Sequence, residues 1–273
     1  MKRYSVALTI AGSDCSGGAG IQADLKTFSA LGVYGTSAIT SIVAENTQGV
    51  QAIEAVSSEM LKQQIISVFD DIRVDAVKIG MLHAPEIVVV VAECIERFQP
   101  KWVVLDPVMI ATSGDMLIEP DTVDLLKKLL FNRATIITPN LDEAAFLSGK
   151  EIKTVEDMKV VGKILLQQGC RNILMKGGHL KEEVMTDILL LQNGESIELK
   201  SPYIDTKNTH GTGCTLSSAI AAHLALGYSL PEAVRNAKTY ITDALNAGKN
   251  IVLGEGHGPV NHFFAPKKLE GIN

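Results

Sequence analysis

Short apolar runs rich in β-branched residues alternate with amphipathic stretches along most of the chain. The apolar runs are too short for helices and are bounded by turn residues, which predicts β-strands at residues 5–11, 36–43, 76–79, 102–105, 135–138 and 173–175. Helical periodicity predicts helices at residues 19–31, 58–70, 85–97, 120–130, 155–168, 213–226 and 231–247. Continuous apolar strands that alternate with helices indicate a parallel sheet covered by helices on both faces.

One segment departs from this alternation. Residues 187–191 and 196–199 are strand-like and flank Gln192-Asn-Gly194, so they are expected to form an antiparallel hairpin at one edge of the sheet. The sequence has no internal repeat, low-complexity segment or linker. We therefore expect residues 1–273 to form a single α/β domain with a mostly parallel central sheet.

Composition narrows the class of protein. Apolar residues make up 46% of the chain and charged residues 21%, as in globular proteins with a sizeable core. The net charge of −6 offers no basic face, so nucleic acid is not an expected partner. No run approaches the roughly 18 apolar residues of a membrane helix, so no membrane association is expected. The first apolar stretch ends at Asp14 without a cleavage site, which favours a strand over a signal peptide.

The four cysteines (Cys15, Cys94, Cys170 and Cys214) are widely separated, with no C-x-x-C pair. A chain this long and rich in core residues does not need disulfides, and no Cys/His pair has zinc-ligand spacing. The cysteine pattern therefore favours a cytoplasmic location.

The carboxyl ends of the predicted strands carry the candidate chemistry. Ligands of open parallel sheets bind beyond these ends, which here are residues 12–20, 44–47, 80–82, 106–109, 139–143 and 176–179. All are enriched in Gly, Asp, Glu, Asn or Lys, side chains that suit a phosphate or metal ligand.

The strongest local motif is Asn208-Thr-His-Gly-Thr-Gly-Cys214, which leads directly into a predicted helix. Gly211 and Gly213 allow close approach of the backbone, and the unpaired N–H groups of a helix N-terminus bind anions. A transferring phosphoryl group would be stabilised there. The alternative is an ordinary glycine-rich turn with Thr209 or Thr212 as the helix cap.

Cys214 lies in the first turn of that helix. The helix dipole is expected to lower the pKa of its thiol, so that a thiolate could serve as a base or a nucleophile. Two alternatives remain open at this point. Cys214 could be a small packing residue, or it could pair with nearby His210 in a cysteine hydrolase.

The motifs at the other strand ends are weaker indications of a site when each is taken alone. Gly12-Ser-Asp-Cys-Ser-Gly-Gly-Ala-Gly20 matches neither a P-loop nor a dinucleotide motif. Asp24 lies in the helix that follows, where a carboxylate also complements the helix dipole.

Asp106 and Glu143 at adjacent strand ends could hold Mg²⁺ through water molecules, although Asn140 and Glu143 also have capping-box spacing. Lys176 either neutralises phosphate charge or extends to solvent.

Taken together, these segments resemble the hydroxymethylpyrimidine/phosphomethylpyrimidine kinases, the thiamin-pathway members of the ribokinase-like superfamily. The resemblance extends over essentially the whole chain and rests on Ala11-Gly-Ser-Asp14, Ser16-Gly-Gly-Ala-Gly-Ile-Gln-Ala-Asp-Leu-Lys-Thr27, Val43-Ala-Glu-Asn-Thr47, Lys78-Ile-Gly-Met-Leu82, Leu105-Asp-Pro-Val-Met109, Ile137-Thr-Pro-Asn140, Leu174-Met-Lys-Gly-Gly-His179, Asn208-Thr-His-Gly-Thr-Gly-Cys-Thr215 and Gly258-Pro-Val260. Most superfamily members have aspartate where Cys214 stands, and cysteine there points to the pyrimidine and vitamin B6 kinases.

The resemblance implies a ribokinase-like three-layer sandwich. It also implies ATP- and Mg²⁺-dependent phosphorylation of 4-amino-5-hydroxymethyl-2-methylpyrimidine, then of its monophosphate to the diphosphate. The small-molecule alcohol, its phosphate and ATP are the expected ligands, and a homodimer is the expected assembly.

The resemblance also assigns roles to residues of this chain. Gly12, Glu45 and Met81 would hold the pyrimidine, with Val108 packed against it and Asp24 near its hydroxymethyl group. The catalytic residues would be Cys214 and Lys176, and Mg²⁺ would be organised by Asp106 and Glu143. The nucleotide phosphates would face Asn140, Lys176, Asn208, Thr209, Gly211, Thr212 and Gly213. The adenine pocket is expected between residues 251–260 and the helix around Lys238.

Glu45 distinguishes the two closest functions. An aminopyrimidine presents an exocyclic amine beside a ring nitrogen, and a carboxyl group pairs with both when one proton is shared. Pyridoxine lacks that amine, so a site built for the pair favours the pyrimidine. A pyridoxine or pyridoxal kinase is the main alternative, followed by a Cys214–His210 hydrolase and a binding protein without activity.

Overall fold

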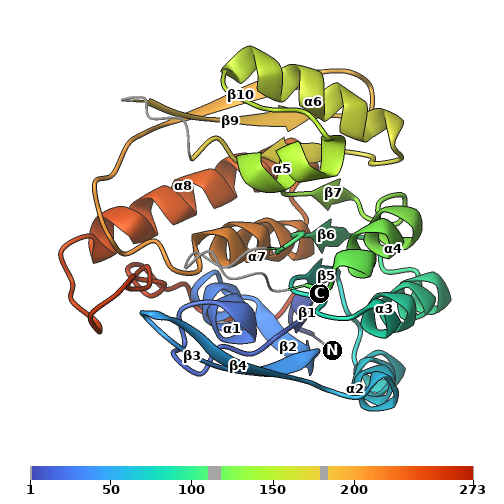
Figure 1. The fold of residues 1–273 in the computed structure, drawn as a ribbon. Coiled ribbons are helices and arrows are strands. Elements are labelled where there is room, and N and C mark those ends of the chain that lie inside the picture. The colour runs from blue at the N-terminus through green and yellow to red at the C-terminus, as the bar shows by residue number, and fades with distance from the viewer. Residues whose placement is uncertain (1, 110–117, 179–183, 273) are drawn as a thin grey trace.

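The computed structural model describes residues 2–109, 118–178 and 184–272; His179, the last residue of one predicted strand end, lies outside them. Within the described chain an eight-stranded sheet has the order β10-β9-β8-β7-β6-β5-β1-β2 (Figure 1). The strands from β2 to β8 in this order are parallel and the β8–β9 and β9–β10 pairs are antiparallel. Their bounds are Val6–Ala11 (β1), Tyr34–Ile39 (β2), Ala76–Ile79 (β5), Val103–Leu105 (β6), Ile136–Ile137 (β7), Ile173–Met175 (β8), Val184–Leu190 (β9) and Ser196–Pro202 (β10).

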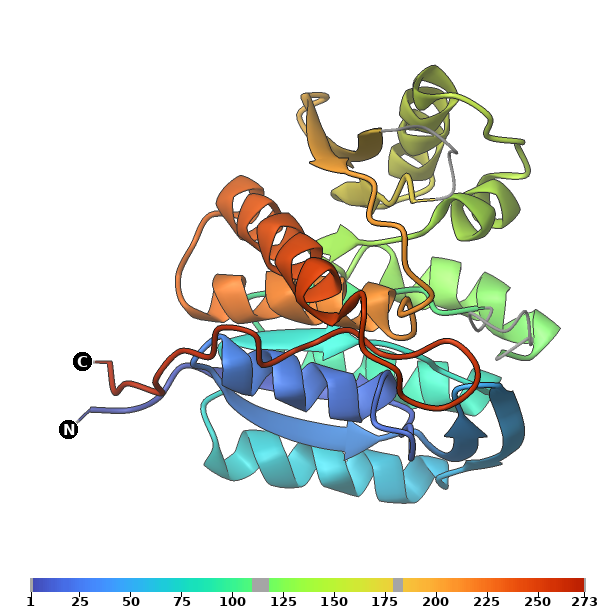
Figure 2. The ribbon, with the colours of Figure 1, turned by 90° about the vertical axis from the view of Figure 1, so that its left-hand side faces the viewer.

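Helices cover both faces of this sheet, which confirms the predicted three-layer α/β architecture (Figures 1 and 2). One face carries α1 (Gly20–Ala30), α7 (Thr212–Ala225) and α8 (Leu230–Gly248). The other carries α2 (Ser58–Asp71), α3 (Pro85–Phe98), α4 (Pro120–Leu130), α5 (Leu141–Ser148) and α6 (Val155–Gln167). None of the described helices is both long and apolar enough to cross a bilayer.

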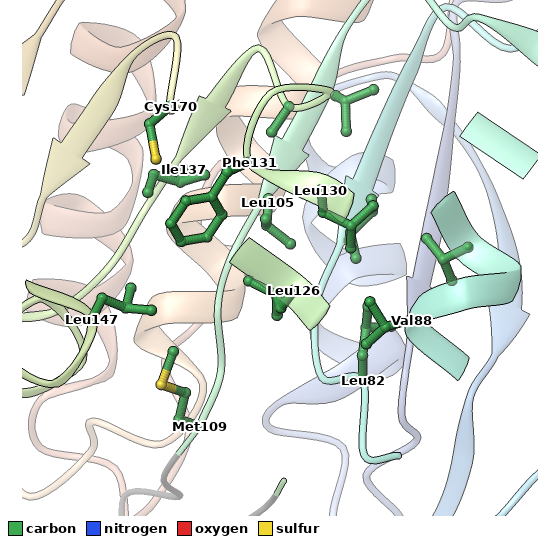
Figure 3. Packing of buried hydrophobic residues seen from close by; sticks show 14 of the residues in the cluster. Leu82, Val88, Leu105, Met109, Leu126, Leu130, Phe131, Ile137, Leu147 and Cys170 are labelled. Atoms are coloured by element: carbon green, nitrogen blue, oxygen red, sulfur yellow. The ribbon is translucent and has the colours of Figure 1, made fainter. Parts of the chain in front are cut away.

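Alternation along each strand divides the core into two layers. In β6, Val103 and Leu105 belong to the layer under α3 and α4, whereas Val104 belongs to the layer under α7 and α8. Figure 3 shows Phe131, at the end of α4, packed near Ile137 of β7. Burying an apolar side chain of this size contributes about 1.5–3 kcal/mol. Because both faces are buried, the strands appear in the sequence as continuous apolar runs.

The predicted strand 36–43 is wrong as a single element. The chain leaves the main sheet after β2, and β3 (Ser41–Asn46) pairs instead with β4 (Gly49–Ala55) in a separate two-stranded sheet. Thr40 lies between the two strands, where the chain leaves the main sheet. Its side chain is buried, and its hydroxyl donates to the carbonyl of Met81 over 2.9 Å. Strand β4 was not predicted, because much of it is exposed and it has no continuous apolar face.

Helix α5 was also absent from the prediction, although its boundaries have clear signals. Asn140 and Glu143 form a complete capping box at its start, and Gly149 ends it in the left-handed conformation at φ 68°. The element is only eight residues long, which is too short for a helical period to stand out.

Candidate active site

A cavity of about 660 Å³ lies along the carboxyl ends of the parallel strands. Most of the predicted site residues line it, as the strand-end rule anticipates: Gly12, Glu45, Met81, Asp106, Val108, Asn140, Glu143, Lys176, Thr209, Gly211, Thr212, Gly213 and Cys214. Asp24 and Asn208 do not. The tertiary structure therefore gathers segments that are up to two hundred residues apart into one site.

The N-terminus of α7 forms the middle of the cavity wall. Gly211 occupies the N-cap position with φ 76°, and no side chain caps the helix. The proposed threonine cap is therefore wrong: the Thr212 hydroxyl instead donates to the carbonyl of Thr209 over 3.0 Å. The first-turn residues Thr212, Gly213 and Cys214 line the cavity. An uncapped helix start with its positive dipole end at a cavity is suited to bind an anion.

Gly211 is required at this position for two reasons. Its φ is one that residues with a side chain rarely adopt. A Cβ atom there would also overlap the carbonyl oxygen of Gly18, in the loop after β1. The two glycine-rich loops therefore touch through their backbones, which places the loop before α1 against the start of α7.

A charged cluster lies beside the α7 N-terminus. The Lys176 ammonium is 2.9 Å from Oδ1 of Asp106 and 4.0 Å from Oε2 of Glu143. Asp106 also accepts hydrogen bonds from Thr138 (2.9 Å) and Ser217 (3.1 Å). Burial acts to raise the pKa of Asp106, but the charge of Lys176 outweighs this effect and holds the pKa below its usual value. Burial, together with the charge of Asp106, raises the pKa of Glu143 to about 7.

Glu143 has a structural role and a cavity-facing role at once. Its Oε2 accepts from the N–H of Asn140 over 2.8 Å, and the Asn140 side chain accepts from the N–H of Glu143 over 2.8 Å. This is the capping box of α5, and both residues also line the cavity. The cap fixes the position of the Glu143 carboxyl next to Lys176.

The opposite end of the cavity combines an apolar cluster with a few polar groups. Val43 and Met81 form a small cluster with partly buried neighbours that include Val50 and Val108. Glu45 projects from β3 into the same end. Burial, and then the charge of Asp14, raise the pKa of Glu45 to about 7. A flat apolar ring with a polar edge is the kind of ligand that such an end accommodates.

The prediction that the helix dipole lowers the pKa of Cys214 is wrong for the substrate-free protein. Burial raises the pKa of its thiol to about 11, although the charge of Lys78 acts in the opposite direction. The structure also gives no support to a Cys214–His210 pair. The ring of His210 is hydrogen-bonded to Asp14 instead, with 2.9 Å between Nε2 and Oδ2.

Asp24 has a different place from the one predicted. Its carboxylate is fully buried and accepts from Thr9 (2.5 Å), Ser218 (2.6 Å) and the ammonium of Lys78 (2.8 and 2.9 Å). Asp24 does not line the cavity, but Lys78 does. Lys78 was not predicted as a site residue because it lies inside an apolar strand, where a lysine without a carboxylate partner would be costly.

Asn208 is likewise structural. Its amide donates to the carbonyls of Gly248 (2.7 Å) and Ile251 (2.6 Å), so it ties the end of α8 to the loop that follows. None of residues 251–260 lines this cavity. The far end of the cavity is instead lined by α8, including Lys238 and Ile241, and by residues 201–204 and 206, at the end of β10 and just after it.

Comparison with known proteins agrees with this geometry. A family model described as phosphomethylpyrimidine kinase matches residues 14–261. The hydroxymethylpyrimidine/phosphomethylpyrimidine kinase of Rhizobium meliloti is 50% identical over 260 residues, which cover 95% of this chain and 97% of that protein.

Solved structures give the same result. A phosphomethylpyrimidine kinase from Clostridium difficile has a TM-score of 0.78 and 50% identity, covering 88% of this chain and 99% of its own. An ADP complex of Bacillus subtilis pyridoxal kinase has a TM-score of 0.88 and 42% identity, covering 95% of this chain and 98% of its own. With its fold and most of its length matched, the chain belongs to the phosphomethylpyrimidine kinase family.

Proposed function

We propose that this protein transfers a phosphoryl group from ATP to the hydroxymethyl group of 4-amino-5-hydroxymethyl-2-methylpyrimidine, and then a second one to the resulting monophosphate. The observation that carries this function is the arrangement of the cavity. One cavity brings together an apolar cluster with Glu45, the charged group around Lys176 and the uncapped N-terminus of α7.

The charged end suits the phosphates of ATP. Lys176 and the first-turn residues of α7 provide positive charge and N–H donors where negative charge develops during phosphoryl transfer. Gly213 lies next to Lys176, because a Cβ atom on Gly213 would be 3.2 Å from the Lys176 ammonium. The adenosine would extend towards Lys238 and Ile241, which line the far end.

The donor set at this end fits a magnesium ion. Asp106 and Glu143 bring two carboxylates close to one lysine, and burial together with the charge of Asp106 raises the pKa of Glu143. Several carboxylate oxygens are already hydrogen-bonded, which favours contact through water, as Mg²⁺ prefers. When bound with ATP, Mg²⁺ neutralises phosphate charge. Asp106 and Glu143 are the residues that would hold it.

The two phosphorylations make different demands on the protein. In the first, an alcohol attacks and must lose a proton, whereas the phosphate oxygen that attacks in the second is already ionised. Cys214 lines the cavity in the first turn of α7, and we assign it the role of proton acceptor in the first step alone. Its pKa of about 11 means that only a small thiolate fraction serves at neutral pH.

Product analysis tests this function directly. The purified protein is incubated with Mg-ATP and the pyrimidine alcohol, and mass spectrometry identifies monophosphate and diphosphate products. Pyridoxal is the matched control substrate, because the same fold occurs in pyridoxal kinases. Phosphorylation of pyridoxal but not of the pyrimidine would contradict the proposal and indicate a vitamin B6 kinase.

The remaining expectations concern the whole molecule. We propose that residues 1–273 act as one catalytic domain, that the protein assembles as a homodimer, and that it works in the cytoplasm. Sedimentation analysis of the purified chain distinguishes a dimer from a monomer.

A further inference from the structure

Three acid–base groups meet at the apolar end of the cavity. Asp14 follows β1, Glu45 lies on β3, and His210 precedes α7; their ligand-type atoms all lie within 4.8 Å of one another. Glu45 and His210 also line the cavity. The phosphoryl chemistry proposed above uses neither Asp14 nor His210.

Asp14 is held as a carboxylate by its surroundings. The side chain is fully buried, and its two oxygens accept the main-chain N–H groups of residues 16–19 over 2.6–3.2 Å. Its Oδ2 also lies 2.9 Å from Nε2 of His210. Although burial opposes ionisation, the hydrogen bond from His210 and those from the main chain hold the pKa of Asp14 well below its usual range. With its lone pairs occupied, Asp14 has little capacity left to bind a metal ion.

His210 is fixed on the other side of Asp14. An ionised Asp14 can only accept, so Nε2 of His210 carries the hydrogen that joins them. The main-chain N–H of His210 donates to the carbonyl of Gly258 over 3.0 Å. The His210 ring packs closely on Gly18, and a Cβ atom on Gly18 would overlap the ring. Although burial acts the other way, Asp14 raises the pKa of His210.

The backbone of β3 aims Glu45 at this pair. The register of the β3–β4 hairpin shifts between Ala44 and Glu45, and such bulges redirect side chains. The Cys15 thiol holds the shifted segment, since its Sγ is 3.1 Å from the carbonyl oxygen and 3.3 Å from the nitrogen of Glu45. The carboxyl of Glu45 is thereby placed beside a permanently charged Asp14.

The other titratable groups near this hairpin point elsewhere. The loop that packs against the β3–β4 turn carries Glu255 and His257, both exposed. His257 donates its N–H to the carbonyl of Thr47, and its ring lies 3.3 Å from the carbonyl of Lys207. Among the residues that the structure describes, Asp14 and His210 are the charged groups that act on the Glu45 carboxyl, and the Cys15 thiol contacts the main chain of Glu45.

We propose that Asp14 and His210 are positioning residues that set the protonation of Glu45, and that the neutral Glu45 carboxyl is the form that recognises the substrate ring. The charge of Asp14 favours the neutral acid, and a protonated His210 opposes it. A neutral carboxyl offers a donor for a ring nitrogen and an acceptor for the adjacent amine, whereas a carboxylate offers two acceptors and repels the ring nitrogen. This inference rests on the proposed aminopyrimidine substrate.

The KM for the pyrimidine alcohol, measured from about pH 6 to 9 with saturating Mg-ATP, tests the proposal. The native KM is expected to rise above about pH 7 as Glu45 ionises. Asp14→Asn removes a charge within 4.8 Å of Glu45 and is expected to move this rise down by about one pH unit or more. His210→Gln removes the opposing charge and is expected to move it up. Opposite shifts cannot arise from simple loosening of the loop.

Glu45→Gln provides the matched control. An amide keeps one donor and one acceptor but does not titrate, so this variant is expected to bind the substrate with a KM that no longer rises through the Glu45 transition. Ionisation of the substrate itself is common to all variants and cancels in the comparison. Curves for Asp14→Asn and His210→Gln that coincide with the native curve would overturn the proposal.

A direct titration separates this inference from the proposed function. Carbon NMR of labelled glutamate in the substrate-free protein follows the Glu45 carboxyl, identified by its absence from the Glu45→Gln spectrum. A native pKa near 7 that falls in Asp14→Asn supports the proposal even if the protein does not phosphorylate the pyrimidine. A Glu45 pKa near the usual glutamate value of about 4.3 would overturn it. If Asp14→Asn does not fold, the native and His210→Gln titrations carry the test.

Discussion

The buried ion pair between Lys78 and Asp24 gives the sharpest stability prediction. Neither side chain has any exposed surface, and the two groups are joined at 2.8 and 2.9 Å. Removing one partner of such a pair leaves the other charge buried, at a cost of about 3–5 kcal/mol. The Thr9 and Ser218 hydroxyls still donate to Asp24 in Lys78→Met. We therefore expect that variant near the lower value and Asp24→Asn, which leaves the ammonium alone, near the upper one.

The double variant Asp24→Asn with Lys78→Met is the control. Exchanging a whole buried ion pair for uncharged side chains is often neutral or stabilising, so the double variant is expected within about 2 kcal/mol of the native protein. Equilibrium urea unfolding of the four proteins measures the coupling free energy from the midpoints and slopes. Single variants that each lose less than about 1 kcal/mol, or losses that simply add in the double variant, would refute the reasoning.

Three further predictions concern single positions. The rate of the first phosphorylation should rise about tenfold per pH unit above neutrality, because only the thiolate of Cys214 accepts a proton and the pKa of its thiol is about 11. Cys214→Ala should abolish this rise and leave the rate of the second phosphorylation unchanged. A native rate that does not change with pH in quench-flow assays would contradict the role of Cys214 as a base. Gly211→Ala should lower kcat about 100-fold because it displaces the start of α7. Gly227→Ala is the control, since Gly227 also has a positive φ but has open space around it. That variant should lose only about 1–3 kcal/mol of stability and keep its activity. Burial lowers the pKa of both His223 and His262 to about 4, so the unfolded chain binds more protons than the folded protein at mildly acidic pH. The free energy of unfolding should therefore fall as pH drops from about 6.5 towards 4, by about 2 kcal/mol per histidine between about pH 7 and 5. His223→Leu should weaken this pH dependence in urea unfolding, and an unchanged pH dependence would show that His223 does not contribute to it.

The layered architecture, and the edge of the sheet where the site lies, follow from the pattern of residues along the chain. Strands with two buried faces must be continuously apolar, so β1, β5, β6 and β8 were visible without a structure. Parallel strands bring their carboxyl ends to one edge, so the polar residues that follow them could be grouped in advance. Asp106 and Lys176 were found in this way and do line one cavity, whereas Glu45 reaches the same cavity from the separate β3–β4 hairpin.

Which polar side chains face that cavity depends on contacts between segments that are distant in the sequence. Asp24 and Asn208 are close to site residues in the sequence, yet their polar atoms are hydrogen-bonded inside the protein. The Asp24 carboxylate accepts from Lys78, and the Asn208 amide donates to a carbonyl at the end of α8. The environment of Cys214 was equally out of reach, because its pKa depends on burial as well as on the helix dipole. Local patterns report which groups a segment carries. Burial and the protonation states that follow from it are set by the partners that folding brings within a few ångströms.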